Sequence, residues 1–154
     1  FSELQDFDYK LSLDTTSLSL EEILNFRPFV IKPNIFEFEK MLSRRPTDLA
    51  SETAKILEKG IENVIVSLGK DGIFYATKGF SRHIPVPDLP VRCNVGAGDS
   101  TLCGFIYAYL NNLSKLDTAC FAAAFGAASV TVEGTNSADF PKIKEVFDII
   151  KSGL

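Results

Sequence analysis

The run Val64–Leu68 is the feature that most constrains how this 154-residue chain folds. Its residues are almost all apolar and largely β-branched, and Gly69 ends the run. A strand that is apolar at successive positions must be buried on both of its faces. This is typical of parallel sheets covered by helices on both sides. We therefore predict an α/β fold with a mostly parallel sheet.

Short runs of the same kind alternate with helical patterns along the chain, and they define the predicted elements. Capping signals stand at Ser19, Asn34 and Asp48, each before a helical pattern. Turn signals at 70–72 and 78–79 predict an antiparallel hairpin toward one edge of the sheet. No repeat or linker divides the chain, so we expect a single domain over 1–154. Strands are predicted over 9–14, 29–31, 64–68, 73–76 and 81–84, and helices over 19–26, 34–42, 48–59, 100–110, 117–132 and 141–150.

Charge and hydropathy exclude several functional classes. The formal net charge is −4 and no basic run occurs, which disfavours binding to nucleic acid or to anionic membranes. No apolar run approaches the ~18 residues of a membrane span, and the first residues lack the pattern of a signal peptide. We expect a cytoplasmic location. The sequence starts at Phe1 rather than at Met, from which we expect a processed or partial chain.

Cysteine and histidine give no metal or disulfide signature. Cys93, Cys103 and Cys120 make an odd count and form no C-x-x-C pair. We expect buried apolar thiols in a reducing compartment. The single histidine, His83, has no partner at a metal-ligand spacing, and we interpret it as an ordinary strand residue.

The segment Asn94–Thr101 is the strongest chemical signal. Gly96, Ala97 and Gly98 leave little side-chain bulk over the backbone just before a helical pattern. Amides at a helix N-terminus, together with the helix dipole, form a cradle for a phosphate. Asp99 adds a carboxylate that could accept a proton from a hydroxyl. The alternative is a tight turn with an ordinary first-turn aspartate. The other phosphate-binding motifs, G-x-x-x-x-G-K-[ST] and G-x-G-x-x-G, are absent.

With the small-residue helix that follows it, Gly96–Asp99 resembles the G-A-G-D signature of the ribokinase-like (PfkB) carbohydrate kinase family. Asn34–Glu37 is similar to the N-x-x-E motif of that family, and Val66–Gly69 with Gly72 to its strand-end segment. The resemblance covers roughly residues 9–150 and implies the C-terminal half of a three-layer ribokinase-like fold, because members are about twice this long. The segments 31–34 and 95–100 are similar to the phosphosugar branch, which includes 1-phosphofructokinase and tagatose-6-phosphate kinase.

The resemblance implies specific roles for these residues. Asp99 would be the general base, and the amides of the Gly96–Asp99 loop would form the anion hole. Lys32 would offer its charge to the phosphates of ATP. Asn34 and Glu37 would organise Mg²⁺ through water. From the residues alone, Asn34 and Glu37 also fit a helix-capping pair, and Lys32 also fits a solvated residue at a strand end.

Further nucleotide contacts are implied at the end of the central strand and in the Ala-rich helix with the segment after it. The simpler alternatives there are a strand-to-turn junction and helix packing by small residues. Where many ribokinase-type members carry an Asp associated with a monovalent cation, this chain has Cys93, so we do not expect potassium activation. The implied nucleotide-binding residues are Ser67, Gly69, Gly72, Gly126, Ser129, Val130, Gly134 and Thr135.

The function implied is ATP-dependent phosphorylation of a phosphorylated hexose, with ATP and a sugar phosphate as partners. Two alternatives remain open: a related kinase for an unphosphorylated sugar or nucleoside, and a non-catalytic nucleotide-binding fragment. Because the missing half would supply most of the sugar-binding residues, we expect the 154 residues alone to be inactive. A half fold also leaves a sheet edge or an apolar face uncovered, so we expect self-association into a homo-oligomer.

Overall fold

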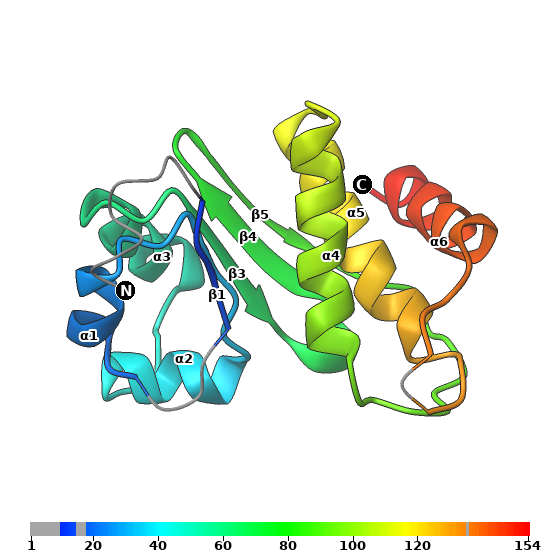
Figure 1. Ribbon diagram of the computed structural model, residues 1–154, viewed down its shortest axis with the longest axis horizontal. Coiled ribbons are helices and arrows are strands. Elements are labelled where there is room, and N and C mark those ends of the chain that lie inside the picture. Colours follow the sequence, from blue (N-terminus) through cyan, green and yellow to red (C-terminus); the bar gives the residue numbers. More distant parts are fainter. Residues whose placement is uncertain (1–9, 15–17, 135) are drawn as a thin grey trace.

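A five-stranded sheet lies between two layers of helices in the computed structural model, which describes residues 10–14, 18–134 and 136–154 (Figure 1). The strand order follows the sequence, β1-β2-β3-β4-β5. The pairs β1–β2 and β2–β3 are parallel, and the pairs β3–β4 and β4–β5 are antiparallel. The strands are β1 (Ser12–Leu13), β2 (Val30–Ile31), β3 (Asn63–Ser67), β4 (Ile73–Thr77) and β5 (Phe80–Ile84).

The sheet confirms the predicted combination of parallel strands and an antiparallel hairpin, although the antiparallel part has the longer ladders. The connection from β3 to β4 is a single 3-10 turn, η2 (Gly69–Asp71). So short a connection can only reverse the chain, because parallel pairing needs a long crossover. The register pairs Ser67 with Ile73 at one end of this hairpin and Asn63 with Thr77 at the other.

Three helices cover each face of the sheet (Figure 1). One layer contains α1 (Leu20–Asn25), α2 (Ile35–Leu42) and α3 (Leu49–Glu58). The other contains α4 (Ala97–Leu110), α5 (Lys115–Ser129) and α6 (Phe140–Ser152).

The central strand is buried on both faces, as predicted from its sequence. Val64 and Val66 belong to the core beneath α1, α2 and α3, whereas Ile65 belongs to the core beneath α4, α5 and α6. All three side chains are 0% exposed. The run Val64–Leu68 therefore has the double-sided environment that its composition requires.

The helix starts at Ser19, Asn34 and Asp48 are confirmed as N-caps. Three helices begin earlier than predicted, α6 by one residue, at Phe140, and α4 and α5 by more. Helix α4 starts at Ala97 rather than Ser100, because Gly96 adopts a left-handed conformation (φ +84°) and takes the N-cap position. Helix α5 starts at Lys115 rather than Asp117 because the Ser114 side chain caps it, and it ends at Ser129 rather than 132.

The prediction that all cysteines are buried is wrong for one of them. Cys120 is buried and Cys93 is half-buried, but Cys103 is exposed on α4. The reason is that Cys103 lies on an apolar stripe of α4 that no described element covers, together with Ile106 and Leu110. His83 is a residue of β5, as predicted.

Some predictions fall on residues outside the described part of the chain: the start of the first strand, the loop 15–17 and Thr135. In the part that is described, no helix is long and apolar enough to cross a membrane.

Candidate active site

The carboxyl ends of β1, β2 and β3 meet at one edge of the sheet because these strands run parallel. Asp14 directly follows β1, Lys32 directly follows β2, and Ser67 ends β3. The Ser67 amide donates to the Pro33 carbonyl at 2.9 Å, and Asn34 pairs with Ser67 in an isolated parallel bridge. Ligands of open α/β sheets bind at this edge. The predicted site residues Lys32, Asn34 and Ser67 are therefore grouped at this edge of the sheet.

An ion pair between a buried lysine and an exposed aspartate lies at this edge. The Lys32 residue is only 4% exposed, and its Nζ lies 3.1 Å from Asp14 Oδ2. The first turn of α4 lies next to the pair, since a Cβ added to Gly98 would be 2.7 Å from Lys32 Nζ. A larger residue at position 98 would therefore displace this lysine ammonium. No role was predicted for Asp14; the only signal for one was a carboxylate at the end of the predicted strand 9–14.

The start of α4 is not capped by a side chain. Gly96 is the N-cap and has no side-chain oxygen, and the first helical bond runs from the Ser100 amide to the Gly96 carbonyl at 2.9 Å. Helix geometry gives the amides of Gly98 and Asp99 no intrahelical acceptor. The Asp99 residue is exposed. The amides therefore remain available to an external anion, beside a carboxylate that solvent can reach.

The segment that leads into α4 is held by α5. The Val130 carbonyl accepts hydrogen bonds from the amides of Arg92 at 2.7 Å and Cys93 at 3.3 Å. Within α4, the Thr101 hydroxyl donates to the Ala97 carbonyl at 2.9 Å. Residues on both sides of the glycine-rich turn thus make hydrogen bonds that hold it in place.

Asn34 and Glu37 form a capping box at the start of α2. The Glu37 amide donates to Asn34 Oδ1 at 3.0 Å, and the Asn34 amide donates to Glu37 Oε2 at 2.8 Å. The capping alternative is therefore confirmed. Glu37 Oε1 takes no part in the box. No group of three or more His, Cys, Asp and Glu side chains that could hold a metal occurs among the described residues. The pair fits a hydrated Mg²⁺, which keeps most of its waters.

Ser67 has a buried hydroxyl without a hydrogen-bond partner in the described part of the chain. Buried hydroxyls in native proteins are nearly always paired. This one lies at the carboxyl end of β3, beside Asn34. A ligand at the sheet edge would give it the missing partner.

The two glycines after β3 differ in their surroundings. Gly69 has a positive φ (+62°), and no atom lies within 4 Å of where its Cβ would be. At Gly72 a Cβ would lie 2.1 Å from the Ile84 carbonyl oxygen, so packing against β5 requires glycine there. A contact between either glycine and a nucleotide stays a prediction.

Some of the residues predicted to contact the nucleotide, in α5 and in the segment after it, have packing roles. A Cβ at Gly126 would lie 2.2 Å from Thr101 Oγ1, and the buried Ser129 hydroxyl donates to the Gly126 carbonyl at 2.7 Å. The first contact supports the helix-packing alternative for Gly126, whereas the hydrogen bond of Ser129 lies within α5. Gly134 is exposed with a positive φ (+66°). Val130, as described above, holds the segment before Gly96. A contact between these four residues and the nucleotide stays a prediction.

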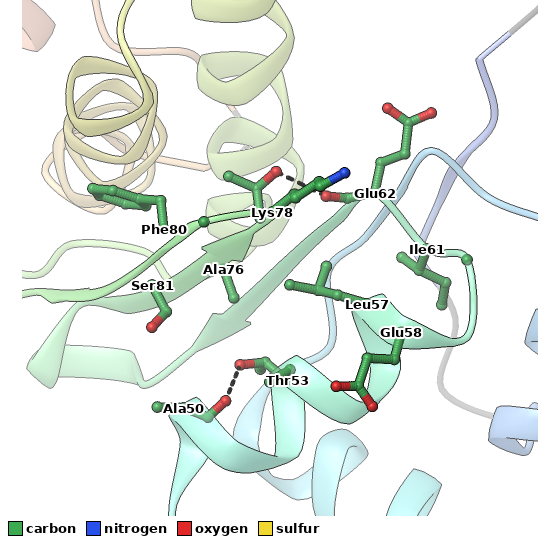
Figure 2. Close-up of a pocket in the computed structure, with 14 residues that line it drawn as sticks. Ala50, Thr53, Leu57, Glu58, Ile61, Glu62, Ala76, Lys78, Phe80 and Ser81 are labelled. Carbon is green, nitrogen blue, oxygen red and sulfur yellow. Dashed lines mark hydrogen bonds between the residues drawn. The ribbon is translucent and has the colours of Figure 1, made fainter.

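A cavity of about 820 Å³ lies elsewhere in the described structure (Figure 2). It lies between α3 and the β4–β5 turn, at the end of the hairpin away from Ser67. Its wall is mainly apolar, including Leu57, Ile61 and Phe80. The Thr53 hydroxyl in this wall already donates to the Leu49 and Ala50 carbonyls. The lining also includes the charged residues Glu58, Glu62 and Lys78, but none of the site residues predicted from the sequence.

Curated relatives match this chain along slightly less than half of their own length. A 1-phosphofructokinase of Borreliella burgdorferi is 37% identical over 144 residues, which cover 90% of this chain and 46% of the relative. A tagatose-6-phosphate kinase of Staphylococcus epidermidis is 32% identical over 145 residues, covering 90% of this chain and 47% of the relative. The chain thus spans about half the length of the relatives it matches.

Solved structures support the fold. Phosphofructokinase-2 from Escherichia coli, in complex with substrates and products, superposes with a TM-score of 0.85 at 22% identity, covering 97% of this chain and 50% of that one. Ribokinase from Thermotoga maritima gives a TM-score of 0.78 at 22% identity, covering 95% and 52%. The predicted ribokinase-like fold is confirmed.

The family profile described as pfkB family carbohydrate kinase matches residues 3–143. This range contains the uncapped start of α4, the Lys32–Asp14 pair and the capping box of α2. By that match, this chain belongs to the pfkB family of carbohydrate kinases.

Proposed function

We propose that these residues form the nucleotide-binding and catalytic half of an ATP-dependent kinase that phosphorylates a phosphorylated hexose. The observation that carries the proposal is the start of α4, where uncapped amides adjoin the exposed Asp99 and the buried Lys32. The names of the relatives, 1-phosphofructokinase and tagatose-6-phosphate kinase, support a sugar phosphate as the acceptor.

Asp99 acts as the general base in this proposal. Its carboxylate accepts the proton of the acceptor hydroxyl while the hydroxyl oxygen attacks the γ-phosphorus of ATP. A new O–P bond forms, the bond from the γ-phosphorus to the β–γ bridging oxygen breaks, and ADP leaves with that electron pair. The exposure of Asp99 supports this role because the acceptor must reach the carboxylate.

The amides of the Gly96–Asp99 loop stabilise the charge on the transferred phosphoryl group. They need no reorganisation, since no side chain caps them in the free protein. Lys32 adds a positive charge beside Gly98. The unpaired Ser67 hydroxyl donates to a phosphate oxygen. Gly69, Gly72, Gly126, Ser129, Val130, Gly134 and Thr135 complete the proposed nucleotide site.

Asn34 and Glu37 would hold Mg²⁺ through water, with Glu37 Oε1 free of the capping box. Bound Mg²⁺ supplies charge neutralisation on the nucleotide phosphates.

The test of this function is phosphoryl transfer by the complete gene product. We expect ATP-dependent phosphorylation of fructose 1-phosphate or tagatose 6-phosphate, and little with fructose or a nucleoside. Phosphorylation of only unphosphorylated acceptors would overturn the assignment of the sugar class. The 154 residues alone should bind Mg-ATP but transfer almost no phosphate, because no acceptor is positioned. Robust turnover by the isolated 154 residues would contradict that expectation.

We also propose that the protein acts in the cytoplasm and self-associates through uncovered surfaces. The exposed apolar stripe of α4 and the edge strand β1 support association. A tetrameric inhibited form is known for Escherichia coli phosphofructokinase-2, a structural relative at 21% identity. Sedimentation of the 154 residues should show oligomers that Leu110→Glu dissociates; a monomer at high concentration would refute this.

A further inference from the structure

We propose that Asp14 is a positioning residue for Lys32: its carboxylate fixes the lysine ammonium beside the first turn of α4. The inference rests on the proposed function, and it assigns a role to a residue that the phosphoryl-transfer scheme above does not use. It follows from three contacts, between β1 and β2, between the two side chains, and between Lys32 and α4.

The pairing of β1 with β2 brings the two residues side by side. The register matches Leu13 with Ile31, so the next residues along the parallel strands are Asp14 and Lys32. The Lys32 amide also donates to the Leu13 carbonyl at 3.3 Å. The ion pair at 3.1 Å is therefore built on backbone pairing rather than on two flexible surface side chains.

Burial makes the carboxylate necessary for this lysine. The side chain of Lys32 is 5% exposed, and that of Asp14 is 35% exposed. A buried ammonium needs a paired anion. The need is greater here, because the positive end of the α4 dipole repels a cation.

Helix α4 fixes where the ammonium can be. A Cβ on Gly98 would lie 2.7 Å from Lys32 Nζ and 3.9 Å from Asp14 Oδ2. The ammonium thus occupies the space that any larger residue at position 98 would fill. An anion bound by the first amides of α4 would meet this charge at a fixed place.

Asp14 acts through Lys32 rather than on the nucleotide. A free carboxylate at this edge would repel phosphate oxygens, whereas a carboxylate paired with an ammonium adds little net charge. Lysine is a point charge on a flexible four-carbon stem. Without Asp14, its ammonium would move, and charge misplaced by about 1 Å can cost a large factor in rate.

A double-mutant cycle on the complete gene product tests this role. The variants are Asp14→Asn, Lys32→Met and the double variant, with kcat and both KM values measured per folded molecule. We expect Asp14→Asn to lower kcat about 10-fold or more while the sugar-phosphate KM changes by less than about 2-fold. In the Lys32→Met background the same change should alter kcat by less than about 2-fold.

Asp117→Asn is the matched control. Asp117 also pairs with a lysine, Lys151, at 2.7 Å, and its side chain is 31% exposed, close to the value for Asp14. It belongs to α5 and takes no part in the proposed site. The control should lower the unfolding temperature but leave kcat within about 2-fold of wild type.

Each outcome of the cycle decides the inference. Additive losses in kcat, or a change confined to the sugar-phosphate KM, would overturn it, because Asp14 would then act independently of Lys32. A wild-type kcat for Lys32→Met would overturn it as well, by removing the charge to be positioned. The proposed function is tested separately by Asp99→Asn. If Asp14→Asn does not fold, Asp14→Ser completes the same cycle with a smaller polar side chain.

Discussion

The helices α2 and α4 both begin at the carboxyl edge of the sheet (Figure 1). Side chains cap the first turn of α2, but no side chain caps that of α4. At α2, Asn34 and Glu37 satisfy each other's amides in a capping box. At α4, Gly96 satisfies none with a side chain. A helix start that its own side chains complete gains stability, whereas one left open gains affinity for an anion.

The comparison separates stability from binding within one edge of the sheet. Glu37 brings negative charge to the start of α2, while Gly96, Ala97 and Gly98 bring no charge or bulk to the start of α4. Asp99 also adds a carboxylate to the first turn of α4, so the proposed affinity of α4 for a phosphate depends on its open amides and on Lys32, whereas Glu37 is proposed to attract the accompanying cation to α2. Substitutions at four positions test this division.

The largest effect is expected at the open helix start. Asp99→Asn should lower kcat at least ~10²-fold, because a general base is lost. Binding of Mg-ATP, measured by calorimetry, should change little, since the amides remain. Asp88→Asn, at an exposed position before the loop, is the control and should keep normal kcat. A near-normal kcat for Asp99→Asn would rule out the base role.

Filling the open start should have the next largest effect. Gly98→Ala adds a Cβ 2.7 Å from Lys32 Nζ, so the ammonium must move. We expect kcat to fall about 10-fold, by the same misplacement of charge. Gly153→Ala, whose Cβ would meet only atoms at 3.7 Å, is the control and should be neutral. Unchanged kinetics for Gly98→Ala would show that this space is not used.

Substitutions of Asn34, at the capped start of α2, should change the stability of the fold and the Mg²⁺ requirement separately. Asn34→Ala removes the cap and should cost about 1 kcal/mol of unfolding free energy. Asn34→Ser keeps a capping oxygen and should retain most of that stability. If the amide also orients the hydrated Mg²⁺, both variants will need more Mg²⁺ for half-maximal activity. An unaltered Mg²⁺ requirement in both would leave Asn34 with the capping role alone.

The smallest effect is expected at a second capping box, at the start of α1, which takes no part in the proposed site. At α1, hydrogen bonds from the Ser19 side chain and backbone hold the pKa of Glu22 below its ordinary value of 4.5. A lowered pKa stabilises the fold fully above pH 4.5, and this stabilisation is lost as the pH falls through the lowered pKa. Denaturant melts should show a weaker acid dependence for Glu22→Gln than for wild type. Equal acid dependence would contradict the assignment.

The sequence predicted those features that depend on local chemistry. Asn34 with Glu37 three residues on defines a capping box, and the continuous apolar run at β3 defines a doubly buried strand. The position of the glycine-rich turn was also predictable, though α4 begins at Ala97 because of a backbone conformation only glycine favours.

What the sequence did not reveal depends on register and on neighbours. The Asp14–Lys32 pair exists only because β1 and β2 are aligned in one particular way. The buried hydroxyl of Ser67 depends on Pro33 and Asn34 crossing beside it. Neither relation leaves a periodic or compositional pattern, so both require coordinates.

The exposed Cys103 is a position at which a fluorescent label can be attached to the surface of α4. It lies one helical turn after Asp99 on the same exposed face of α4. Burial raises the pKa of the Cys120 thiol to about 11, so that thiol resists alkylation, and Cys93 is only half-exposed. A maleimide fluorophore would therefore label Cys103 first, and its emission would register any molecule that settles over α4.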